Sequence, residues 1–125
     1  MNIRQVFLIV AAIGLAPIAL SYGLTPQKSL SYLFQIPASD TNSIHIFRAI
    51  MGLYLALVLF WLFGAMKTEV RQAALYSLVI FMLGLALGRV LSIVLDGFPH
   101  PLLTTYLVLE LFFGAAGIIM LRRGE

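Results

Sequence analysis

The chain has 125 residues, of which 62% are hydrophobic and only 10% charged, and its mean hydropathy is +1.03. Soluble domains carry about 25% charged residues, so this composition has too little polar surface to cover a soluble globule. The net charge is only +3, and no basic stripe with interleaved aromatic residues is present, which argues against nucleic acid as a partner. The composition predicts a membrane protein, and the length predicts one domain over residues 1–125.

Four apolar stretches predict four transmembrane helices, at about 5–22, 44–65, 70–95 and 101–121. Each is close to the roughly 20 residues that a spanning helix needs. Short connections separate the last three, so neighbouring helices are expected to run antiparallel. The expected fold class is therefore all-α, a transmembrane four-helix bundle.

The only long connection is the loop 23–43. Leu30, Leu33 and Phe34 recur there at helical spacing, which predicts a short helix on the membrane surface. Asp40 precedes the second apolar run, where its carboxylate can accept hydrogen bonds from the first amides of a helix. The loop is thus expected to contain a helix of its own and to end at an N-cap.

The basic residues predict how the chain is oriented. With four spans, five of them share the face that carries both termini, namely Arg4, Lys67, Arg71, Arg122 and Arg123. Lys28 is the one basic residue outside the spans on the opposite face. The positive-inside rule then places both termini in the cytoplasm and the loop 23–43 outside.

Three charged residues, Arg48, Arg89 and Glu110, lie inside the predicted spans, and Asp96 lies at the outer end of the third. Such a residue costs about 2.5 to 3.5 kcal/mol near the middle of the membrane, so these side chains are expected to face inward and pair. At about 1.5 Å per helical residue, the three intramembrane charges lie roughly 6, 12 and 15 Å below the outer surface. All four are therefore expected to meet in the outer half of the bundle, with Ser92 on the same face as Arg89 and Asp96.

This cluster is compatible with three functions. In the first interpretation it is a structural ionic network that sets the register of the helices. In the second it is an outward-facing pocket in which the arginines hold an anionic or polar headgroup while Glu110 orients it. In the third interpretation Glu110 carries a proton, as in a small proton-coupled transporter or a membrane enzyme. The leading expectation is a non-enzymatic binding or accessory protein.

Four aromatic or imidazole side chains are further candidates for the cluster: His45, Tyr54, His100 and Tyr106. The two histidines begin predicted helices, which favours interfacial or capping roles over haem ligation. The chain has no cysteine, which excludes thiolate metal sites. No cofactor or metal is expected.

Two motifs resemble a bacterial family of small four-span membrane proteins whose function is unknown. They are RAxxGLYL, beginning at Arg48, and GRxxSxxxDGxP, beginning at Gly88, followed by a glutamate in the last span. The family's marked positions correspond to Arg48, Gly52, Tyr54, Gly88, Arg89, Ser92, Asp96, Gly97, Pro99 and Glu110. The resemblance implies the four-span fold and a place in the bacterial cytoplasmic (inner) membrane, and it brings no activity. The expected partners are membrane lipids, with a larger membrane complex or a homo-oligomer as the alternatives.

Overall fold

The structure, a computed structural model, describes residues 1–123. These residues form one short and four long helices: α1 (Ile3–Gly23), α2 (Pro26–Phe34), α3 (Thr41–Met66), α4 (Thr68–Asp96) and α5 (Pro101–Arg123). The long helices, α1, α3, α4 and α5, are each apolar enough over sufficient length to cross a membrane. The predicted all-α fold with four spans is confirmed, and α2 is the short helix expected in the loop.

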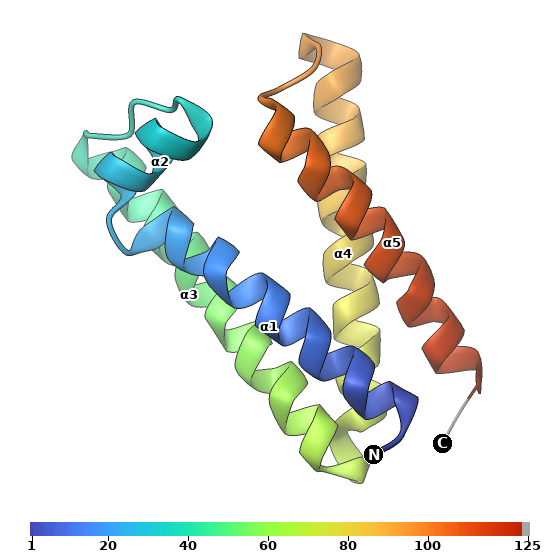
Figure 1. The fold of residues 1–125 in the computed structure, drawn as a ribbon. Helices are drawn as coiled ribbons and strands as arrows, with labels where there is room; N and C mark the ends of the chain where they lie inside the picture. Colours follow the sequence, from blue (N-terminus) through green and yellow to red (C-terminus); the bar gives the residue numbers. More distant parts are fainter. Residues whose placement is uncertain (124–125) are drawn as a thin grey trace.

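The four spans form two antiparallel pairs, α1 with α3 and α4 with α5 (Figure 1). The pairs lie close together at the end that carries the N-terminus, here called the terminal end. They diverge toward the opposite end, here called the α2 end, where α2 lies across α1 and α3. This divergence leaves room between the pairs in the half of the bundle nearer α2.

Small side chains hold α1 and α3 together. Ala11, Ala12 and Ala19 of α1 are almost fully buried, as is Ala65 of α3. In a membrane, where lipid is as apolar as a leucine side chain, such residues stabilise a helix pair by letting the two backbones approach closely. The pair is thus continuous along its length and forms one wall of the bundle.

A polar contact network joins the terminal ends of α1, α3 and α4. The guanidinium of Arg71, only 4% exposed, donates from Nε to the carbonyl of Gly64 at 3.1 Å and from Nη2 to that of Ala65 at 2.9 Å. The Gln5 amide donates to the same Ala65 carbonyl at 3.0 Å. The last carbonyls of a helix have no partner within it, so these side chains satisfy the end of α3.

The helix boundaries near the α2 end follow local chemistry. Asp40 is the N-cap of α3: its carboxylate accepts from the Ser43 amide at 3.0 Å and from the Ser43 hydroxyl at 2.7 Å. Gly97 ends α4 with a φ of +90°, a conformation that residues with a Cβ rarely adopt. His100 accepts a hydrogen bond at Nδ1 from the Leu102 amide and so caps the start of α5.

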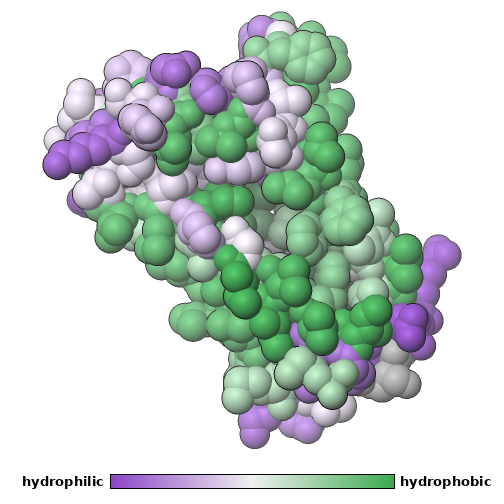
Figure 2. Space-filling view, in the orientation of Figure 1, coloured by the Kyte–Doolittle hydropathy of each residue, from purple (hydrophilic) through white to green (hydrophobic). Residues whose placement is uncertain are grey.

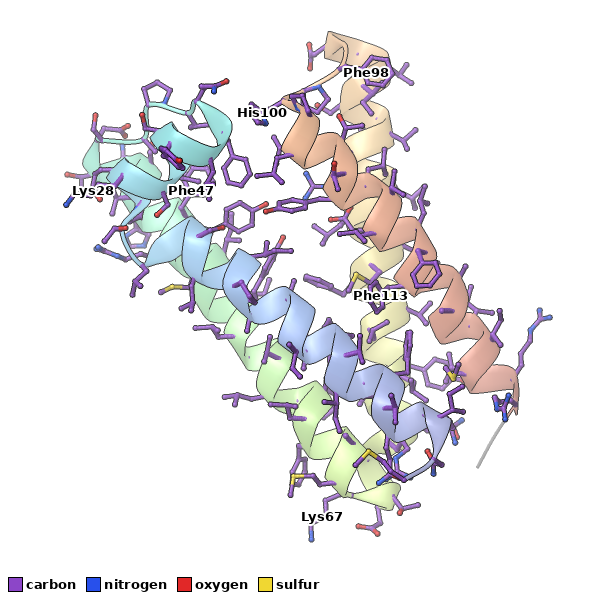
Figure 3. All side chains as sticks on the ribbon, in the orientation of Figure 1. Lys28, Phe47, Lys67, Phe98, His100 and Phe113 are labelled. Carbon is purple, nitrogen blue, oxygen red and sulfur yellow. The ribbon has the colours of Figure 1, made fainter. Side chains whose placement is uncertain are left out.

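The lateral surface is apolar, as a membrane-embedded bundle requires. Large side chains on α4 and α5 point outward, among them Ile80 (71% exposed) and Leu87 (72% exposed). Figure 2 shows hydrophobic residues over most of this face, with hydrophilic residues gathered over α2 and at the terminal end. Lys67 lies at the terminal end and Lys28 near α2 (Figure 3). The polar groups thus lie at the two ends of the apolar spans.

Two helical glycines provide a matched test of how closely α3 and α4 pack. A Cβ on Gly64 would collide with the Cβ of Ala74, whereas a Cβ on Gly84 would have no atom within 4 Å. Gly64→Ala should therefore lower the free energy of unfolding by about 1 to 3 kcal/mol through overpacking. Gly84→Ala should leave it unchanged or raise it by up to about 1 kcal/mol, because alanine favours helix. Unfolding in detergent micelles, followed by circular dichroism, measures both; equal effects would contradict the close approach.

The Asp40 cap predicts a pH dependence at the start of α3. Hydrogen bonds from Ser43 hold the pKa of the Asp40 carboxyl below its ordinary value. Because the folded-state pKa is lowered, the cap stabilises the helix above the ordinary pKa and is lost as the pH falls through the folded-state value. Exchange of the Ser43 amide hydrogen, corrected for its intrinsic pH dependence, should accelerate over that range. Asp40→Asn, which keeps a capping oxygen, should abolish the acid response, and the same response in that variant would refute the assignment.

Candidate functional site

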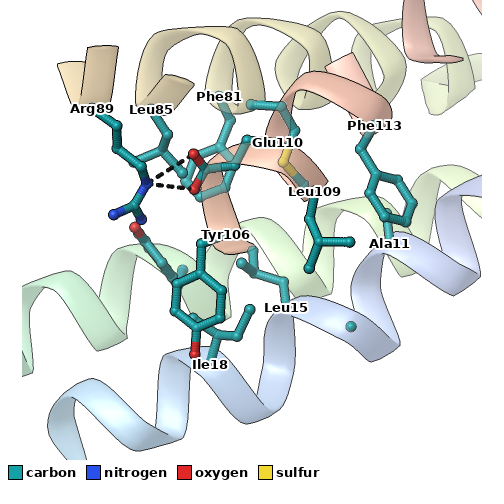
Figure 4. Close-up of a pocket in the computed structure, with 13 residues that line it drawn as sticks. Ala11, Leu15, Ile18, Phe81, Leu85, Arg89, Tyr106, Leu109, Glu110 and Phe113 are labelled. Carbon is teal, nitrogen blue, oxygen red and sulfur yellow. Dashed lines mark hydrogen bonds and ion pairs between the residues drawn. The ribbon is translucent and has the colours of Figure 1, made fainter. Parts of the chain in front are cut away.

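One ion pair links α4 and α5 in the half of the bundle nearer α2. Arg89 of α4 donates from Nε to both carboxylate oxygens of Glu110 of α5, at 2.9 and 3.1 Å (Figure 4). The Glu110 side chain is 8% exposed and that of Arg89 is 20% exposed. The two residues lie well inside their spans, so each charge has its counter-charge where water cannot solvate it.

The pair lies in the wall of a cavity between the two helix pairs. The cavity has a volume of about 80 Å³, and all four spans contribute to it. Its lining residues are Ala11, Gly14, Leu15 and Ile18 of α1, Tyr54 of α3, Phe81, Met82, Leu85 and Arg89 of α4, and Tyr106, Leu109, Glu110 and Phe113 of α5. Arg89 and Glu110 are the only charged residues among them. The cavity is thus an apolar space with one ionic patch.

Tyrosines surround the ion pair. The guanidinium carbon of Arg89 lies 5.8 Å from the centre of the Tyr106 ring, within the range of a cation–π contact. The side chains of Tyr22 and Tyr54, whose rings meet edge to face at 5.6 Å, interact electrostatically with Arg89 and Glu110. Aromatic rings thus cover the pair, and their hydroxyl groups add polar atoms to the same region.

Arg89 keeps hydrogen-bond donors that Glu110 does not use. A guanidinium has five N–H donors, and here Nε serves both carboxylate oxygens. The two terminal nitrogens of Arg89 point away from Glu110 in Figure 4. Within residues 1–123, only the Tyr22 side chain comes within hydrogen-bonding reach of Arg89 besides Glu110. The site therefore offers strong donors to a molecule that brings an acceptor.

Arg48 does not join this pair, contrary to expectation. Its Nε donates to the carbonyl of Gly23 at 3.2 Å, at the end of α1. With His45 it lines a separate, shallow groove on α3. Arg48 precedes Tyr54 by six residues, which at 100° per residue turns it about 120° away from the side of α3 that faces the cavity. The prediction that two positive and two negative charges meet is therefore wrong for Arg48.

Asp96 and Ser92 also lie apart from the pair. Both are exposed, and no ion pair in the described part of the chain joins Asp96 to an arginine. Asp96 is the last residue of α4, about 10 Å along the helix from Arg89. A carboxylate at the end of a span is solvated by water and needs no buried partner. The expectation that Asp96 meets the cluster is therefore also wrong.

The remaining predicted residues divide between the cavity and the helix ends. Tyr54 and Tyr106 line the cavity, as described above. His100 caps α5, and its ring meets that of Phe34 edge to face at 6.5 Å. His45 is exposed. Among residues 1–123, no group of three or more histidine, aspartate or glutamate side chains is arranged to hold a metal ion.

Tyr22 is the site residue that the sequence did not indicate. It is 7% exposed and packs against Tyr54, although the predicted first span ended at this position. Its spacing was the available signal, since Leu15, Ile18 and Tyr22 recur at three and four residues and share one face of a helix. That face of α1 proves to be the one that covers the cavity.

Comparison with known proteins assigns the chain to a family. A family model described as a domain of unknown function, DUF4345, matches residues 3–121. The protein therefore belongs to the DUF4345 family. No curated protein and no solved structure matches it. The family match covers all four spans and the Arg89–Glu110 pair. The description of the family names no activity.

The ion pair predicts a characteristic pattern of stability. Arg89→Gln and Glu110→Gln should each lower the free energy of unfolding by about 3 kcal/mol, because each leaves one charge buried alone; the 20% exposure of the Arg89 side chain places the cost at the low end of the known range. Combining Arg89→Leu with Glu110→Leu should cost much less than the sum of the two single leucine changes. Asp96→Asn, at an exposed position, serves as the control and should change little. Additive effects in detergent unfolding would show that the two charges do not interact.

Proposed function

We propose that this protein is a non-enzymatic membrane protein that binds a lipid headgroup or another small amphiphile in the cavity between its helix pairs. The observation that carries the proposal is the set of Arg89 donors left unused by Glu110 beside an apolar cavity. In hydrocarbon an unsatisfied donor costs several kcal/mol, so a ligand with an acceptor is stabilised at this position. Glu110 holds the guanidinium of Arg89 in place, while the terminal nitrogens of Arg89 contact the ligand.

The placement of charge supports an orientation in the bilayer. Arg4, Lys67 and Arg71 lie at the terminal end, as do the two arginines in the last turn of α5. We propose that this end is cytoplasmic, in a bacterial inner membrane, and that α2 lies on the outer side. The cavity then belongs to the outer half of the membrane, and its ligand is a component of the outer leaflet.

Native mass spectrometry of the protein, released from its own membranes in mild detergent, tests the proposed function. One reproducible small-molecule adduct is expected on the wild-type chain, and it should be lost in Arg89→Gln and retained in Asp96→Asn. Because Arg89→Gln is destabilising, its circular dichroism spectrum must first show a folded protein. An adduct that survives in folded Arg89→Gln would place the ligand elsewhere and overturn the proposal.

The same spectra distinguish the other functions. A larger assembly of fixed stoichiometry without an adduct would make the protein an accessory subunit. A chain with neither partner nor adduct would leave two functions for the ion pair: a purely structural role, or proton movement through Glu110. For the latter, Glu110→Gln should keep the fold and abolish a cellular phenotype, whereas a purely structural pair predicts that phenotype and folded protein are lost together.

A further inference from the structure

The cavity opens to the side of the bundle, between α1 and α5. Two of its lining residues, Gly14 of α1 and Leu109 of α5, are exposed, the latter by 44%. No atom lies within 4 Å of the position that a Cβ on Gly14 would occupy, so the absent side chain leaves a gap. Figure 2 shows a hollow between these two helices, bordered by hydrophobic residues and by residues of intermediate hydropathy. The opening therefore faces the hydrocarbon of a membrane.

Aromatic side chains close the cavity toward α2. Phe34, the last residue of α2, is 4% exposed, and its ring meets the Tyr106 ring edge to face at 6.1 Å. It also contacts the ring of Tyr22 at 5.8 Å and that of His100 at 6.5 Å. These contacts bridge the two helix pairs where they diverge. Phe34 thus separates the ion pair from the aqueous side at this end.

From these two features we infer that the ligand resides in the bilayer and enters sideways between α1 and α5, and that it has an uncharged head with a hydrogen-bond acceptor and one slender apolar chain. This inference rests on the proposed function and specifies the class of ligand. A long-chain alcohol or an ester of one chain has the required chemistry.

The charge of the site favours an uncharged head. Arg89 and Glu110 neutralise each other, so the ionic patch has no net charge. An anionic head would add an uncompensated charge inside the membrane, at a cost of about 2.5 to 3.5 kcal/mol. A hydroxyl or ester oxygen accepts from the terminal nitrogens of Arg89 without that cost.

The size of the cavity limits the rest of the ligand. An engineered protein cavity of about 150 Å³ binds benzene, and this one is only about 80 Å³. The comparison favours one slender chain over a ring or over two chains side by side. One extended chain fits between apolar walls such as Leu15 and Phe113, and the remainder of the chain leaves through the lateral gap.

The single tryptophan provides the measurement. Trp61 is fully buried, and its ring lies 5.7 Å from that of Phe81, which lines the cavity. Bromine on a bound chain quenches nearby tryptophan fluorescence, so a chain in the cavity should quench Trp61 saturably. The probes are 2-bromododecan-1-ol, 2-bromododecanoate and 2-bromododecane, which carry bromine at the head end of the chain, the part that the cavity holds. Each is carried in phosphatidylcholine vesicles and mixed with the protein reconstituted in the same lipid.

Saturable quenching by the alcohol is expected, with the carboxylate and the alkane weaker by about tenfold or more. Gly14→Leu, which fills the gap, should lose saturation, while Gly84→Leu, another open helical position outside the cavity lining, should behave as wild type. Phe34→Ala should leave the rate of quenching within about twofold of wild type, because entry does not pass α2.

Each contrary result has a distinct meaning. Equal saturation by the carboxylate overturns the uncharged head. Unchanged binding in Gly14→Leu, or a strongly accelerated rate in Phe34→Ala, overturns lateral entry while leaving the binding site in place. If the adduct of the native protein is lost in Arg89→Gln but no probe saturates, the inferred ligand class is wrong and the proposed function stands. If neither an adduct nor saturation is found, both fail.

Discussion

A guanidinium inside hydrocarbon must have a counter-charge, and this requirement constrains the α4–α5 half of the bundle. Arg89 and Glu110 meet only if their helices run antiparallel and place the two residues at the same depth. The short connection through Gly97 imposes this arrangement. The pair replaces the hydrophobic effect, which is absent between helices in lipid, as a source of register. Buried ionic pairs are weak evidence for stability in general, but they specify one arrangement among several of similar packing energy. Here the specified arrangement also places a polar group beside a cavity.

The two helix pairs are stabilised by different means. Alanines allow α1 and α3 to pack closely, whereas the Arg89–Glu110 ion pair links α4 to α5. At the terminal end the two pairs are joined by Arg71 of α4, which satisfies the last carbonyls of α3. Toward α2 the space between them is bridged by the Phe34 ring and its aromatic neighbours. A cavity is the expected result when two helix pairs lie close together at one end and are bridged only by side chains at the other.

Composition and hydrophobic length predicted the four spans, and the cost of intramembrane charge predicted that Arg89 and Glu110 face inward. Their depths could be estimated because each is counted from the same turn. Arg48 has no such reference: which face of α3 meets α1 is decided by the alanines of the partner helix, and a single sequence does not show that choice. Asp96 was misplaced because a charge at the end of a span is solvated and needs no partner. Tyr22 was missed because it lay at the expected end of its helix.

Gly14 shows how an absent side chain can define a site. In a soluble protein the gap beside it would be filled with water, and the cavity would be a wet surface pocket. In a bilayer the same gap is filled by acyl chains, so molecules already dissolved in the membrane have the shortest route to Arg89. Recognition then needs little from the apolar walls, because binding only exchanges one hydrocarbon contact for another. Selectivity for a bilayer ligand must instead come from the one polar patch that lipid tails cannot satisfy, the Arg89 donors that Glu110 leaves unused while it holds the guanidinium in position.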